Sequence, residues 1–96
     1  MSEYRVLLGD DARAYLDLLD EKSKRICKEN LRKLAANPYP GAGKGDKEKL
    51  VIGGHEQYRL HIGRTHTAFY VIDESDATVR VHEITDIDDA HKRYGF

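Results

Sequence analysis

Residues 57–72, QYRLHIGRTHTAFYVI, contain two strand patterns separated by a short turn. The first pattern alternates strictly, so its apolar side chains share one face and Arg59 and His61 share the other. The second pattern, residues 66–72, is rich in aromatic and β-branched side chains. Because only Gly63-Arg64-Thr65 connects them, the two strands are predicted to pair antiparallel.

Three further stretches are predicted to extend this sheet. Residues 49–52 form a weaker strand that ends at Gly53-Gly54, and residues 78–84 alternate again after a turn at residues 74–76. Residues 3–8 are predicted to form a short first strand. We therefore expect a sheet of four or five strands that is mostly antiparallel, because short connections join antiparallel neighbours.

Two helices are predicted between the first strand and the rest of the sheet. Asp10 and Asp11 open the first helix and Asp20 opens the second. The second helix ends at Asn37-Pro38, because the residue before a proline avoids helical geometry. With almost no linker between them, the helices should form an antiparallel hairpin that covers one face of the sheet. The apolar stripes are Ala12, Tyr15, Leu16 and Leu19 in the first helix and Cys27, Leu31, Leu34 and Ala35 in the second.

A short final helix over residues 86–94, capped by Asp86, completes the expected fold. The fold class is α+β, with the element order β-α-α-β-β-β-β. We expect residues 1–96 to form a single domain, because a chain of this length is too short for two. In this arrangement the sheet face opposite the helices carries polar side chains and is the expected binding surface.

The composition is that of an ordinary globular domain, with 40% hydrophobic and 34% charged residues. The single cysteine, Cys27, cannot form an internal disulfide, and its place on the apolar stripe predicts a core residue rather than a nucleophile. No secretion signal opens the chain, and no apolar run approaches the roughly 20 residues that span a bilayer. We therefore expect a soluble, cytoplasmic protein with no membrane partner.

The net charge of −1 does not indicate a nucleic-acid-binding protein. The charge is nevertheless uneven, with +1 over residues 1–37, +2 over residues 38–64 and −4 over residues 65–96. A local basic patch can bind phosphate even when the total is close to neutral. The alternative is ordinary solvated surface charge.

Arg59 and His61 lie two residues apart on one strand, so their side chains share a face about 6.6 Å apart. Arg64 and His66 flank the next turn and are expected to join them. Two guanidinium and two imidazole groups suit a phosphodiester, because arginine binds phosphate and histidine moves protons near neutral pH. The alternative is a solvated strand edge with incidental charges. Further positive charge beside the site is expected from Lys44, Lys47, Lys49 and Arg80.

Other chemistries have less support in the sequence. His61 and His66 suggest zinc, but no cysteine or carboxylate pair completes a ligand spacing, so neither a metal nor a cofactor is predicted. Residues 41–45 are rich in glycine, but a helix precedes them and a strand follows, contrary to a phosphate-binding loop. His82 either faces the site or is a hydrogen-bonded histidine of the sheet.

The element order and three short motifs together resemble the RelE/ParE toxin superfamily over nearly the whole chain. The motifs are residues 50–53, YRLHIG at residues 58–63 and FYVI at residues 69–72. The ending VRVHEI…AHKRYG is similar to the last strand and tyrosine-bearing tail of that family.

The resemblance implies the toxin of a type II toxin–antitoxin system, a RelE-like enzyme that cleaves mRNA in the ribosomal A site without a metal ion. In that reaction the ribose 2′-OH attacks the adjacent phosphate, assisted by basic side chains and a C-terminal tyrosine or histidine. By position, Arg59 and His61 match the basic residues, and Tyr94 or His91 matches the C-terminal group. The implied partners are a cognate antitoxin and mRNA on the ribosome.

The chain departs from the family pattern at two places. The third-strand arginine of active members falls near Thr67, and the basic residue after the last strand falls near Asp86 or Ile87. Such arginines stabilise charge in the transition state. Two alternatives therefore stay open: a ParE-like inhibitor of DNA gyrase, and a weakened toxin homologue that acts only by binding its antitoxin.

Overall fold

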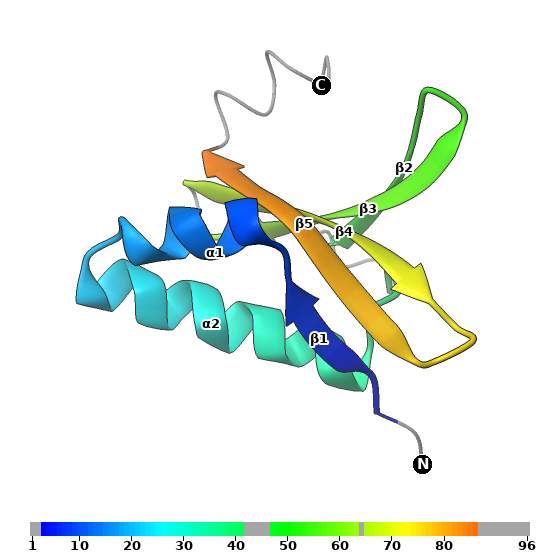
Figure 1. Cartoon of the computed structure of the whole chain (residues 1–96), viewed down its shortest axis with the longest axis horizontal. Coiled ribbons are helices and arrows are strands. Elements are labelled where there is room, and N and C mark those ends of the chain that lie inside the picture. Colours follow the sequence, from blue (N-terminus) through cyan, green and yellow to red (C-terminus); the bar gives the residue numbers. More distant parts are fainter. Residues whose placement is uncertain (1–2, 42–46, 64, 87–96) are drawn as a thin grey trace.

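A computed structural model describes residues 3–41, 47–63 and 65–86, and within them the chain forms two helices and a five-stranded sheet (Figure 1). This is the predicted α+β class. The elements in chain order are β1 (Arg5–Leu8), α1 (Asp10–Asp17), α2 (Glu21–Ala36), β2 (Lys47–Ile52), β3 (His55–Ile62), β4 (His66–Asp73) and β5 (Thr78–Asp86).

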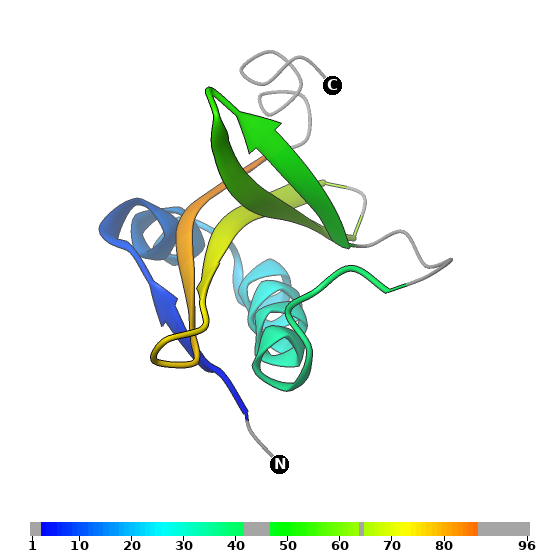
Figure 2. The same ribbon diagram turned by 90° about the vertical axis from the view of Figure 1, so that its right-hand side faces the viewer.

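The sheet is mixed rather than simply antiparallel. Its strand order is β1-β5-β4-β3-β2, and the strands β2 to β5 pair antiparallel with their neighbours in the chain. β1 pairs parallel with β5, so that Val6 lies opposite Val79 and Leu8 opposite Val81. Two helices and the three strands β2 to β4 separate β1 from β5 along the chain, and such a long connection permits the parallel arrangement. Figure 2 shows the strong twist of the sheet, because the β2–β3 hairpin (green) runs in a different direction from β5 and β1 (orange and blue).

Tight turns fix the hairpins where the sequence predicts them. Gly53 and Gly54 join β2 to β3. Their φ values of 59° and 83° are rarely adopted by residues other than glycine. Three residues, 63–65, connect β3 to β4, and their number sets the register in which Ile62 lies opposite His66.

The limits of α2 follow directly from the sequence. The Asp20 side chain accepts a hydrogen bond of 2.7 Å from the Ser23 backbone N–H, and this bond lowers the pKa of the Asp20 carboxyl. At the other end Asn37 is extended and Pro38 follows, so the helix stops at Ala36. Both boundaries confirm the prediction.

One apolar core joins both helices to one face of the sheet, which we call the helix-covered face. The strand residues of this core have side chains on the same side of the sheet as Leu60 and Tyr70. α1 contacts mainly β5, whereas α2 contacts β1 and β3, so the two helices meet different parts of the sheet. The fully or nearly buried core residues are Ala12, Leu16, Cys27, Leu31, Leu34, Tyr58, Leu60, Ile62, Ala68, Tyr70, Val79, Val81 and Ile84.

The expected final helix over residues 86–94 lies outside the described residues except at its first position. There Asp86, the expected N-cap, is the last residue of β5 and pairs with His66. An extended backbone is compatible with an N-cap, so the capping role of Asp86 stays a prediction. No helix among the described residues is both long and apolar enough to cross a membrane.

Candidate functional site

The face of the sheet opposite the helices carries Arg59 and His61, as the alternation in β3 predicts. We call this the helix-free face. In the antiparallel register Arg59 lies opposite Phe69 and His61 opposite Thr67 on β4. The centre of this face is not an open polar surface, because Phe69 and Thr67 are almost completely buried.

Arg59 is held by an acidic partner on the neighbouring strand. Glu48 on β2 lies directly opposite Arg59, and the Glu48 carboxylate accepts a hydrogen bond from the Arg59 guanidinium. Arg59 is only 7% exposed. A phosphate that binds Arg59 would therefore have to compete with a carboxylate that is already in place.

His82 lies on the helix-free face, above Phe69. Its ring is stacked on the Phe69 ring with centroids 6.5 Å apart, and its Nε2 is 2.9 Å from Oε1 of Gln57 on β3. Although much of the residue is exposed, this partial burial lowers the pKa of the His82 imidazole. His82 is thus a hydrogen-bonded sheet histidine, and it also faces the candidate site.

His66 lies on the other side of the sheet. It pairs with Ile62, whose side chain is in the core, and its Nδ1 is 2.8 Å from the Tyr15 hydroxyl of α1. The two rings meet edge to face with centroids 5.7 Å apart. Burial and the nearby Asp86 carboxylate raise the pKa of Tyr15. The expectation that His66 joins Arg59 and His61 on one face is therefore wrong.

The other cations predicted to bind RNA also have oxygen partners. Lys47 Nζ donates to the backbone carbonyl of Asn37 at 2.7 Å, and Lys49 Nζ lies 3.1 Å from the Glu56 carboxylate. The bond to Glu56 raises the pKa of the Lys49 amine. Each of these lysines therefore binds an acceptor within the protein.

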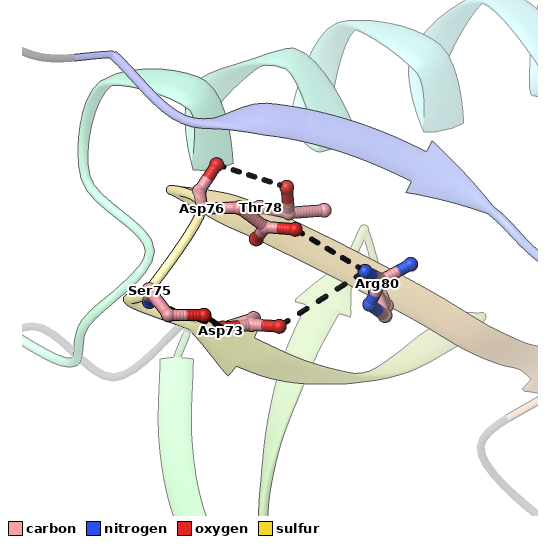
Figure 3. Close-up of polar contacts among 5 residues, drawn as sticks. All are labelled: Asp73, Ser75, Asp76, Thr78 and Arg80. Carbon is pink, nitrogen blue, oxygen red and sulfur yellow. Dashed lines mark hydrogen bonds and ion pairs between the residues drawn. The ribbon is translucent and has the colours of Figure 1, made fainter.

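Arg80 sits in a small polar network at the turn between β4 and β5 (Figure 3). Its guanidinium lies 3.5 Å from the Asp76 carboxylate and 4.0 Å from that of Asp73. Asp73 also accepts hydrogen bonds from the Ser75 hydroxyl and backbone N–H, and these bonds lower the pKa of its carboxyl. Two carboxylates surround one guanidinium here, so this corner of the molecule is not a basic patch.

Four predicted site residues fall outside the described part of the chain: Lys44, Arg64, His91 and Tyr94. Within residues 3–41, 47–63 and 65–86 there is no group of three or more potential metal ligands. The structure thus brings together Arg59, His61 and His82 on the helix-free face and removes His66 from it.

Sequence reasoning missed the residues that complete this site. Glu48 and Gln57 bind Arg59 and His82, respectively, and Phe69 carries the His82 ring. The pairing of Glu48 with Arg59 depends on the register between β2 and β3, which no local pattern reveals. The aromatic composition of residues 66–72 was the one feature of the sequence that pointed to Phe69.

No protein-family model matches the sequence, and no curated protein matches it by sequence. Solved structures do match the fold. The RelE–RelB complex of the archaeon Pyrococcus horikoshii superposes with a TM-score of 0.72 at 24% identity, covering 88% of this chain and 94% of that one. The toxin–antitoxin complex RelBE2 of Mycobacterium tuberculosis gives 0.73 at 20% identity, covering 88% and 98%.

A third solved structure has the same fold. The YoeB/ParE toxin of Agrobacterium tumefaciens superposes with a TM-score of 0.69 at 15% identity, covering 85% of this chain and 96% of that one. All three matches span nearly the full length of both chains, and they agree with the motifs found in the sequence. The chain therefore has the fold of the RelE/ParE toxin superfamily.

Proposed function

We propose that residues 1–96 form a single toxin domain, the toxin of a toxin–antitoxin pair, and that it cleaves mRNA on the ribosome without a metal ion or cofactor. The fold supports the toxin role, because the matched structures from Pyrococcus horikoshii and Mycobacterium tuberculosis are toxin–antitoxin complexes. By the same likeness, the expected partner is a cognate antitoxin.

The observation that carries the enzymatic proposal is that Arg59 and His61 on β3 and His82 on β5 lie on one face, on either side of β4. In this proposal the ribose 2′-OH attacks the adjacent phosphorus, and the 5′ oxygen of the next nucleotide leaves. Arg59 stabilises the charge of the pentacoordinate phosphate, and His61 takes the proton from the 2′-OH and gives it to the leaving 5′ oxygen. Arg64, Tyr94 and His91 are proposed to assist. His66 has no role in the reaction, because it binds Tyr15 on the opposite face.

A second candidate is a toxin homologue that binds its antitoxin without cleaving RNA. The ion pairs favour it, since Arg59, Lys49 and Arg80 each contact a carboxylate that a phosphate would have to replace. Inhibition of DNA gyrase has less support, because the complexes matched above are of the RelE type.

A cleavage assay on ribosomes programmed with mRNA distinguishes these candidates. Wild-type protein is expected to cut the mRNA, and Arg59→Ala should cut it on the order of 10²-fold more slowly if the guanidinium stabilises transition-state charge. Arg13→Ala is the matched control, because Arg13 is an exposed arginine of α1 on the other side of the molecule. Both variants are first compared with wild type by thermal unfolding.

The outcomes separate cleanly. Equal cleavage by Arg59→Ala and wild type would remove Arg59 from the mechanism. Absence of both cleavage and gyrase inhibition by wild-type protein that still binds its antitoxin would establish the second candidate. A gyrase supercoiling assay on the same preparation tests the third possibility.

A further inference from the structure

Helix α2 carries the strongest concentration of positive charge in the described part of the chain. Its sixteen residues include six Lys or Arg and two Glu, a net charge of +4. The charges are not scattered around the helix. A hollow of about 270 Å³ is lined by Glu21, Lys24, Arg25, Lys28 and Arg32.

Most of this charge is not neutralised within the protein. Lys24 lies 4.0 Å from Glu21, a distant pair in which the Glu21 side chain is almost fully exposed. Among the residues that the structure describes, Arg25, Lys28 and Arg32 take part in no ion pair. This contrasts with Lys49, whose charge is matched by Glu56 at 3.1 Å.

An apolar groove continues this basic surface. It has a volume of about 210 Å³ and lies between α2 and β1, and it shares Lys28 and Arg32 with the hollow described above. Its remaining lining residues are Val6, Leu8 and Leu31, all apolar. The combined surface therefore has an apolar floor and a cationic rim.

The strand that borders the groove is at the end of the sheet. β1 pairs only with β5 in the described strand order, and the backbone N–H groups of Arg5 and Gly9 donate toward the β5 side. In a parallel ladder alternate residues face opposite edges, so the backbone groups of Val6 and Leu8 point to the outer edge. An edge of this kind readily accepts another polypeptide.

We propose that this groove, formed by Val6, Leu8, Lys28, Leu31 and Arg32, binds an acidic segment of the antitoxin that also presents apolar side chains. The identification of the segment with the antitoxin rests on the proposed function. Carboxylates would meet the rim of Lys28 and Arg32, and apolar side chains would cover the floor. An RNA backbone satisfies only half of this surface, since phosphates gain nothing from Val6, Leu8 and Leu31.

The test measures binding between this chain and the small protein encoded by the adjacent gene, purified together and then separated. The variant Lys28→Glu/Arg32→Glu reverses the charge of the rim. The matched control is Lys22→Glu/Lys33→Glu. The control changes the net charge of the same helix equally, at exposed cations that do not line the groove. We expect the rim variant to raise Kd at least about tenfold and the control to leave it within about twofold.

Hydrogen exchange supplies a second readout that does not depend on these substitutions. In the complex, the backbone amides of residues 5–8 and 24–32 should exchange more slowly than in the free chain. Both variants must unfold at a temperature similar to that of wild type before their Kd values are compared.

Each outcome decides the inference. A complex with unchanged Kd in the rim variant, and with protection elsewhere, overturns the groove but leaves the toxin proposal standing. If the rim variant instead weakens binding to ribosomes while its Kd for the adjacent-gene protein is unchanged, the surface binds RNA and the inference is wrong. If wild-type protein forms no complex, the toxin–antitoxin proposal itself fails.

Discussion

Glu48 and Arg59 face each other across the β2–β3 ladder, and the Glu48 carboxylate binds a guanidinium that is almost completely buried. The pair has two opposite effects on a site that would cleave RNA. It fixes the Arg59 side chain in one position, which favours a preorganised site. It also occupies the group that would have to bind phosphate, which reduces the attraction for RNA.

We predict that Glu48→Ala destabilises the protein and increases cleavage of mRNA. Removing the carboxylate from a buried guanidinium should lower the free energy of unfolding by about 1–3 kcal/mol. Chemical denaturation checks the first effect and the ribosome assay the second. Glu56→Ala serves as control, since its partner Lys49 is solvated and the loss should be too small to measure. Unchanged stability in Glu48→Ala would show that the pair contributes nothing to the fold.

We predict that Tyr15→Phe destabilises the protein without affecting mRNA cleavage. The substitution removes the hydroxyl that bonds to His66 Nδ1 and keeps the aromatic packing. Losing this part-buried bond should cost about 1 kcal/mol, or about 4–8 °C in Tm for a domain of this size. Thermal unfolding followed by circular dichroism gives the shift. A large loss of cleavage with unchanged Tm would return His66 to the candidate site and would add Tyr15 to it.

The elements with strong local signals could be predicted from the sequence. The alternation of residues 57–62, the glycines at positions 53 and 54 and the Asp20 cap all act over a few residues, and each has the predicted role in the structure. The parallel pairing of β1 with β5 could not be predicted in this way. It joins segments about 70 residues apart, and no local pattern specifies the partner of an edge strand.

The face of the sheet on which His66 lies could not be predicted from the sequence either. Residues 66–72 are apolar or aromatic at nearly every position, so no alternation distinguishes the two faces, and only the register with Ile62 assigns His66 to the core side. The basic surface of α2 was concealed for a different reason. Acidic residues before the helix reduce the net charge of residues 1–37 to +1, although α2 alone carries +4.

We predict that the Cys27 thiol is unreactive in the folded protein. The side chain is fully buried in the core, and burial raises the pKa of the thiol, so little thiolate is present at neutral pH. A thiol-specific chromogenic reagent should label native protein very slowly and should label one thiol per chain in guanidinium chloride, since the chain has one cysteine. Rapid stoichiometric labelling of native protein would contradict the buried position.

The last prediction concerns the acid stability of the helix-free face. Packing of His82 against Phe69 lowers the pKa of the imidazole in the folded state, while the unfolded chain keeps a value of about 6.5. Below that pH the unfolded state therefore binds more protons than the folded state, so stability falls as the pH falls through the folded pKa. The contribution is fully present above about pH 6.5.

His82→Phe keeps a ring over Phe69 and removes the titrating group. Lowering the pH from 7.5 to 5 should therefore lower the Tm of wild type more than the Tm of His82→Phe. His55→Phe is the control, because His55 is exposed at the start of β3 and does not stack on Phe69. If the wild-type and His82→Phe curves stay parallel over this range, the neutral form of His82 is not favoured by folding. The stacked geometry would then have no effect on proton binding.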